Sequence, residues 1–248
     1  MGAGFAMKRP LAGAVLALGL LALGLLAAAP ALAQQVLVQA DVAADTLAPI
    51  TGPNRRYYGH FYLAYAAVAG PGAAGAPVRY GPASGELQLG GRLKFRLSQA
   101  LALTADARYA YLRYGLAQQA GKTVPTATLH EAETLTLHQL QPEVGLRLNV
   151  GERGNTVGNY LDVLAWGSLA FRTEHSTADA PPPGAGSLQT TVGNPAYLRR
   201  RGGGLGLRLG HDRYALVARY RLGSAWAADY AAWPALPRWL LGLELGLF

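Results

Sequence analysis

Ionisable side chains recur at every second position in several stretches of this sequence. In the stretch 86–97, Glu86, Arg92, Lys94 and Arg96 stand at even positions, whereas the odd positions hold leucine, phenylalanine or glycine. Residues two apart lie on one face of an extended chain. The same phase in later stretches holds Asp106, Arg108, Glu143, Arg147, Asp162, Arg172, Arg208, Arg213, Arg219, Arg221 and Glu244. Because both signs occur on this face, we expect ion pairs in an enclosed space, with basic residues in excess.

Residues that could support catalysis or metal binding are sparse by comparison. The five histidines are His60, His130, His138, His175 and His211, and there is no cysteine for a thiol nucleophile, a disulfide or a thiolate metal site. There is no G-x-S-x-G motif, and no second histidine stands at the H-E-x-x-H spacing after His130 and Glu131. Neighbours such as His175 and Ser176 would point to opposite faces of a strand. The sequence therefore predicts no catalytic, cofactor or metal site.

Alternation of apolar and polar residues predicts the elements that would position the charges. Eight candidate strands lie near 56–68, 84–97, 101–114, 134–150, 159–172, 199–210, 213–223 and 238–248. The segments between them are alternately long and short along the chain, so all the long ones lie at one end of the sheet. Turn-forming stretches such as Gly70-Pro71-Gly72 indicate that the long segments are loops.

The first 33 residues have the layout of a secretory signal peptide. Lys8 and Arg9 precede nineteen residues without a polar side chain, Leu11 to Ala29, and Ala31-Leu32-Ala33 forms a small-residue cleavage site. An uncleaved helical anchor is the alternative. We expect a signal peptide at 1–33, an N-terminal periplasmic lead segment at 34–55 and one barrel domain at 56–248.

Removal of this segment changes what the composition implies. The 248-residue chain is 51% hydrophobic with a formal charge of +8, but residues 1–33 hold 24 of its hydrophobic residues, which leaves about 47%. No later run approaches the ~20 apolar residues of a spanning helix, so a helical membrane bundle is excluded. An exported chain would not meet nucleic acid, despite its basic charge.

Alternation alone does not say which face of the strands is inside. A soluble lipocalin-like barrel turns its apolar face inward, whereas an outer-membrane barrel turns that face to lipid and encloses the polar one. Mixed charges in mid-strand and the loop alternation favour the membrane phase. The aromatic residues also favour it, because they stand near strand ends as in the two membrane girdles: Tyr57, Tyr65, Phe95, Tyr109, Tyr111, Phe171, Tyr214, Tyr220 and Trp239.

In architecture, residues 56–248 resemble the small eight-stranded outer-membrane barrels, similar to the transmembrane domain of outer-membrane protein A and its relatives X and W. The resemblance implies an all-β, closed, antiparallel up-and-down transmembrane β-barrel, most simply of eight strands although ten are possible, with long extracellular loops and short periplasmic turns. It also implies that Phe248, at the end of the last strand, is an assembly signal for the barrel-insertion machinery. One departure is that Gly246 and Glu244, rather than leucines, share the phase of Phe248.

The expected function is that of an integral protein of the bacterial outer membrane with a structural or surface-interaction role. An eight-stranded barrel is just wide enough to be filled by its own side chains, so a plugged, basic, ionic lumen is expected. The alternatives are a narrow anion-preferring channel, a soluble lipocalin-like barrel and a barrel enzyme acting on lipid A or phospholipid. Expected partners are outer-membrane lipid, lipopolysaccharide and the barrel-assembly machinery, for a monomer. Arg199, Arg200 and Arg201, at the long-loop end, are candidates to contact lipopolysaccharide phosphates.

Overall fold

The computed structural model describes residues 51–151, 154–184 and 186–248. The expected signal peptide at 1–33 and residues 34–50 of the lead segment lie outside the described residues. Across the described ranges, no helix is long and apolar enough to cross a membrane.

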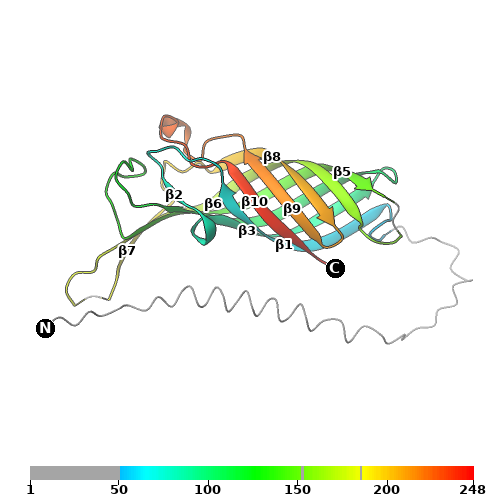
Figure 1. Ribbon diagram of the computed structural model, residues 1–248, viewed down its shortest axis with the longest axis horizontal. Coiled ribbons are helices and arrows are strands. Elements are labelled where there is room, and N and C mark those ends of the chain that lie inside the picture. The colour runs from blue at the N-terminus through cyan, green and yellow to red at the C-terminus, as the bar shows by residue number, and fades with distance from the viewer. Residues whose placement is uncertain (1–50, 152–153, 185) are drawn as a thin grey trace, which may run out of the picture. The chain divides into compact units, whose positions relative to one another are not determined.

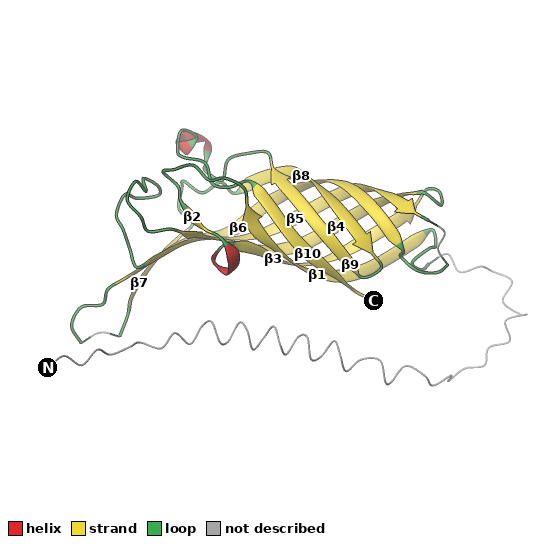
Figure 2. Cartoon of the chain, viewed as in Figure 1, coloured by secondary structure: helices red, strands yellow, loops and turns green. Residues whose placement is uncertain are grey.

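Strands dominate the described part of the chain, as Figure 2 shows. Eight of them match the predicted ranges closely: β1 Tyr57–Ala69, β3 Gly85–Arg96, β4 Leu101–Leu116, β5 Ala132–Val150, β6 Asn159–Asp179, β8 Arg201–His211, β9 Tyr214–Arg221 and β10 Trp239–Leu247. Two short strands, β2 Val78–Arg79 and β7 Leu188–Gly193, and two single-turn 3-10 helices, η3 Gly81–Ala83 and η4 Ala228–Tyr230, lie in the long connections. The all-β prediction is confirmed.

The eight long strands close into a ring. Each pairs antiparallel with its neighbours in the order β1-β3-β4-β5-β6-β8-β9-β10, and β10 pairs back with β1. The paired residues can be followed around the ring from Ala67 on β1. Through β3, β4 and β5 they lead to Glu174 on β6, whereas through β10, β9 and β8 they lead to Val163 on the same strand. That stagger along a single strand is the shear that tilts the strands of a closed barrel.

The outer wall of the ring is apolar. Leu243, Val144 and Leu216 are 64%, 63% and 60% exposed, and further leucines on every long strand share this face. Aromatic side chains edge it at both ends, with Tyr57 and Phe95 in edge-to-face contact at one and Tyr220 and Trp239 in contact at the other. An exposed apolar cylinder between aromatic edges is the surface of a transmembrane barrel. The alternative lipocalin-like phase is wrong, because it would place these leucines inside.

A β-bulge divides the barrel wall from an extension at the long-loop end. His138 pairs with Arg172 whereas Gln139 pairs with Ala170, so Phe171 is an extra residue in β6. Beyond the bulge the interior holds the main buried hydrophobic cluster, which includes Leu135, Leu137, Tyr114 and Trp226. We call this region the head, and define it as residues 70–84, 112–138, 172–200 and 222–238.

The strand ends differ sharply in their connections. At one end of the barrel the three connections are short: 97–100, 151–158 and 212–213. At the other end the long connections form the head. The outer parts of β5 and β6, together with β7, extend the sheet beyond the barrel wall, where β7 is labelled in Figure 1, and β4 pairs with the other side of β5 there. The long and short loop ends predicted from the sequence are therefore segregated.

Candidate functional site

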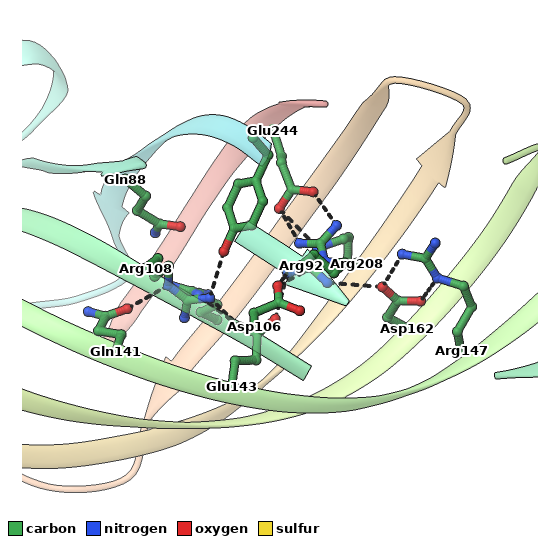
Figure 3. Close-up of polar contacts among 12 residues, drawn as sticks. Gln88, Arg92, Asp106, Arg108, Gln141, Glu143, Arg147, Asp162, Arg208 and Glu244 are labelled. Atoms are coloured by element: carbon green, nitrogen blue, oxygen red, sulfur yellow. Dashed lines mark hydrogen bonds and ion pairs between the residues drawn. The ribbon is translucent and has the colours of Figure 1, made fainter. Parts of the chain in front are cut away.

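The interior of the barrel wall is occupied by a connected set of ion pairs, shown in Figure 3. Arg208, from β8, lies near its centre. Its guanidinium nitrogens lie 2.9 Å from Asp162 Oδ2, 2.6 Å from Glu143 Oε1 and 3.1 Å from Glu244 Oε2. Asp106 is farther, at 3.6 Å. One arginine thus joins carboxylates from four other strands.

Arg92 completes the pairing around Glu244. It donates both terminal nitrogens to that carboxylate, at 2.6 and 2.8 Å, and its Nε to Asp106 Oδ2 at 2.8 Å. The Tyr62 ring lies 4.6 Å from its guanidinium carbon. Bidentate geometry fixes the arginine plane as well as neutralising the carboxylate.

Glu143 joins this group to a second one nearer the head. Arg108 and Arg219 both donate to its Oε2, at 2.7 and 2.9 Å, and Arg219 also contacts Glu86 at 3.1 Å. Gln141 bridges Arg108 and Glu86: it accepts a hydrogen bond from Arg108 Nε at 2.8 Å and donates one to Glu86 Oε2 at 3.0 Å. Gln88 donates to the other oxygen of Glu86.

Arg147 and Asp162 close the network toward the short-turn end. Arg147 donates Nε and Nη2 to the two oxygens of Asp162, at 2.7 and 2.9 Å, and its guanidinium carbon lies 3.6 Å from the centroid of the Tyr160 ring. All ten charged side chains of the network are at most 4% exposed.

Lys94 is buried outside the network, and the network itself is neutral. It holds five arginines and five carboxylates: Arg92, Arg108, Arg147, Arg208, Arg219, Glu86, Asp106, Glu143, Asp162 and Glu244. All ten lie on the face that the alternation assigned to the lumen. Equal numbers of the two signs let every buried charge lie next to an opposite one, and an unpaired buried charge would be costly.

The other five basic residues expected in the lumen lie outside this network. Arg172 is exposed and pairs with Glu174 at 2.6 Å, because the bulge at Phe171 reverses the phase of β6. Arg213 is exposed in the β8–β9 turn, and Arg221 contacts Tyr114 and Pro237 inside the head. Lys94 and Arg96 donate to the backbone oxygens of Pro53 and Asn54 at the short-turn end.

Small residues make room for the interior side chains. A Cβ on Gly90 would lie 2.6 Å from the Cβ of Arg108 and 2.9 Å from Tyr62, and one on Gly210 would overlap the Tyr160 ring. Several interior polar atoms also have no protein partner, among them Asp106 Oδ1, Arg147 Nη1 and Trp166 Nε1. Buried groups of this kind are positions for bound water.

The ring, its apolar wall and its ionic interior together decide the architecture. The chain is a small antiparallel β-barrel of eight long strands. No protein-family model matches it, and neither does any curated protein. Among solved structures it is similar to two crystal structures of Ail, the attachment invasion locus protein of Yersinia pestis, one of them in complex with the heparin analogue sucrose octasulfate. These are 10% (complex) and 12% identical, with TM-scores of 0.34 and 0.35; each match covers 76% of this chain and 97% of Ail.

A second polar cluster lies in the head. Lys122 is buried on the 117–131 loop and lies 2.7 Å from Glu133 Oε2, while His175 Nε2 lies 2.8 Å from Glu133 Oε1. Tyr197 contacts the other ring nitrogen of His175 at 2.6 Å. Burial and the nearby Glu133 carboxylate raise the pKa of Tyr197 to about 12. We call these four residues the head clasp, because they join two loops to β5 and β6.

Sequence reasoning did not single out the head clasp or the neutral members of the interior network. Gln88, Gln141 and Tyr62 lie in the lumen phase, so alternation alone could have found them. Lys122 stands in a loop without periodicity, and no local signal marks it. Within the described ranges, no group of three histidine or acidic side chains is arranged to hold a metal ion.

The remaining predicted site residues lie at the two ends of the barrel. Arg199, Arg200 and Arg201 are exposed at the long-loop end, and Arg201 pairs with Leu169 at the start of β8. Phe248 packs edge-on against Tyr58 and His60 at the short-turn end, with ring centroids 5.8 and 5.3 Å apart. Phe248 therefore lies on the same face of the chain as Glu244, the face that points into the lumen.

Proposed function

We propose that this chain is an integral protein of a bacterial outer membrane with a surface-interaction role and no enzymatic activity. The barrel anchors the head, and the head presents the sheet formed by the outer parts of β5 and β6 with β7. Long-loop ends of such barrels face the cell exterior and short turns face the periplasm. The observation that supports the membrane location is the exposed apolar outer wall of the barrel.

The open edge of β7 carries the interaction proposal. All six residues of β7 are exposed, and among the described strands it pairs only with β6. Its sequence, Leu188 to Gly193, has neither a lysine nor a proline, which usually protect an edge strand from further pairing. An extended peptide of a partner protein could therefore add to this edge through backbone hydrogen bonds.

The ionic interior has a supporting role in this proposal. Its arginines and carboxylates neutralise one another and fill the space between the strands, which supports a plugged barrel over an anion-preferring channel. In planar bilayers the purified protein should show little conductance; sustained anion-selective current would favour the channel instead.

The proposed membrane location implies two partners for residues at the ends of the barrel. Arg199, Arg200 and Arg201 would meet lipopolysaccharide phosphates, for which the planar guanidinium is well suited. Phe248 would be read by the barrel-assembly machinery, with the folded protein a monomer.

Cysteine labelling on intact cells tests the location and the exposure of the edge together. The chain has no cysteine, so Thr190→Cys and Gln99→Cys each introduce a single label site, on β7 and on a short turn. A membrane-impermeant maleimide should label Thr190→Cys alone. Labelling of both, or a chain that is soluble without detergent, would contradict the proposal.

Replacement of residues 180–193 by a glycine–serine linker of equal length deletes β7 and tests the interaction itself, while it still lets the chain span from Asp179 to Asn194. The closed ring does not depend on β7, so the variant should still fold in detergent and shift on heating in gel electrophoresis. Cells displaying the intact chain should capture extended peptides from a random library, and cells displaying the deletion should not. Equal capture by both would exclude the β7 edge.

A further inference from the structure

Two adjoining hollows lie beside the β8–β9 turn at the short-turn end. One is an apolar groove on the outer wall, lined by residues of β5, β6, β8, β9 and β10. The other is a polar pocket formed by the turn with the 151–158 connection and Phe248. His211 and Tyr214 line both, so the two hollows adjoin at these residues.

The apolar groove follows the membrane-facing surface. Its sides are Leu209, Leu216 and Leu243, which are 57%, 60% and 64% exposed. Gly210 and Ala215, whose side positions face the barrel interior, line the groove between them. The first polar groups along it are His211 and Asn159, whose side chains lie 2.6 Å apart at the end nearest the turn. A groove of this kind accepts a hydrocarbon chain.

The polar pocket presents an exposed cation, Arg213, next to the carboxylate of Asp212. Arg213 is exposed, and within the described part of the chain no carboxylate forms an ion pair with it. Its backbone oxygen accepts a hydrogen bond from Gly246 N at 2.7 Å, and its guanidinium carbon lies 5.3 Å from the Phe248 ring. The Asp212 Oδ1 accepts a hydrogen bond from Gly158 N at 2.8 Å, and its Oδ2 lies 3.7 Å from His211 Nε2. Thr156 and Asn155 add polar groups to the same pocket.

We propose that these hollows form one binding site for an anionic glycerophospholipid of the periplasmic leaflet. The phosphate would sit at Arg213, beside His211 and Thr156, and one acyl chain would lie along Leu209 and Leu216. Arginine pairs with phosphate through two parallel hydrogen bonds, which supplies orientation as well as charge. The site rests on the proposed membrane location, since the short turns must face the periplasm for this leaflet to reach it.

Native mass spectrometry of the full chain in dodecyl maltoside micelles, with added phosphatidylglycerol, tests this site. The two parts of the site have matched variants. Arg213→Gln removes the cation, with Arg79→Gln on the head as its control. Leu209→Trp fills the groove, with Leu207→Trp as its control, because Leu207 is exposed on the same face of β8 but does not line the groove.

The wild-type protein should retain one phosphatidylglycerol per barrel. Arg213→Gln should weaken retention by about tenfold, the loss of one charge-assisted contact. Leu209→Trp should weaken it to a similar extent because the indole occupies the place of the acyl chain, and both controls should retain lipid as the wild type does. Glycerol 3-phosphate and diacylglycerol, which carry the phosphate or the chains alone, should not be retained.

Equal retention by Leu209→Trp and Leu207→Trp would overturn the site, and so would retention of diacylglycerol. A dimer that Leu209→Trp abolishes would assign the groove to a second copy of the chain instead. Heat-shifted migration in gels separates these outcomes from failure of the membrane proposal. If the wild type does not form a detergent-folded barrel, the membrane proposal fails; if it folds but binds no lipid, only this site fails.

Discussion

The barrel wall and the head arrange the same residue types in opposite ways. In the wall, β5 points Glu143 inward and Val144 outward, whereas beyond the bulge it points Leu135 inward and Thr134 outward. Odd positions of β5 face the interior throughout, so the residue types change while the strand does not turn over. The medium outside explains the difference: lipid requires apolar groups on the outer face, and water requires them inside.

The two regions also differ in what holds them together. The wall has ten buried charges connected through its centre, and the head has an apolar cluster with aromatic contacts, such as Trp226 with Trp233 at 5.2 Å between ring centroids. Burial of apolar surface can stabilise the head because its alternative environment is water. Burial of apolar side chains would not stabilise the interior of the wall in the same way, because the surrounding lipid is as apolar as a hydrophobic core.

Loss of one interior carboxylate should therefore have the largest effect. Glu143→Gln leaves Arg108, Arg208 and Arg219 short of a shared partner, and removing one partner of a buried pair costs about 3–5 kcal/mol. Glu174→Gln removes the exposed partner of Arg172 and should cost about 0–1 kcal/mol. Urea unfolding of both variants in detergent micelles measures the difference, and similar midpoints would mean that the interior pairs do not hold the wall.

Arginine scanning of β5 should give the next largest effect. Leu146→Arg on the apolar wall should destabilise the inserted barrel by about 2–4 kcal/mol. Thr134→Arg lies on the same face of the same strand beyond the bulge, where water accepts the charge, and should change little. Folding into lipid vesicles, followed by heat-shifted migration in gels, compares them. Equal yields would place the membrane boundary somewhere other than the bulge.

The wall is the region that the sequence predicts well. Its strands need one apolar and one polar face, so the period of two in 86–97 or 101–114 marks both the strand and its orientation. Charges such as Arg92 and Asp106 then fall on the interior face without any knowledge of their partners. The sequence does not reveal which arginine pairs with which carboxylate, because that depends on the stagger of the whole ring.

The head is predicted less well, for physical reasons that particular residues show. The alternation places Arg172 in the lumen, because its even position follows the phase of Asp162. The extra residue Phe171 reverses this phase and has no local signature in the sequence. The sequence does not indicate β7, because Leu188 to Gly193 is exposed on all sides and so has no alternation. The buried Lys122 owes its position to contacts made by a folded loop, and composition alone cannot indicate those.

Acid should loosen the head clasp, the smallest of the three effects. Burial tends to raise the pKa of Glu133, but hydrogen bonds from His175, Lys122 and Gln118 outweigh it and hold that pKa below its ordinary value of 4.5. A carboxylate with a lowered pKa stabilises the folded head above pH 4.5, and this contribution is lost as the pH falls through the folded pKa. Tryptophan emission should therefore shift to the red in acid as Trp226 and Trp233 become hydrated.

Glu133→Gln isolates that contribution from the titration of the interior carboxylates. It should lower the stability of the head by about 1.5–3 kcal/mol at neutral pH and remove the clasp's part of the acid shift. Glu131→Gln, two residues away and exposed, is the matched control and should keep the wild-type profile. If Glu133→Gln and Glu131→Gln follow the same acid profile, the head is held by its apolar cluster alone, and the contrast with the charge-filled wall becomes complete.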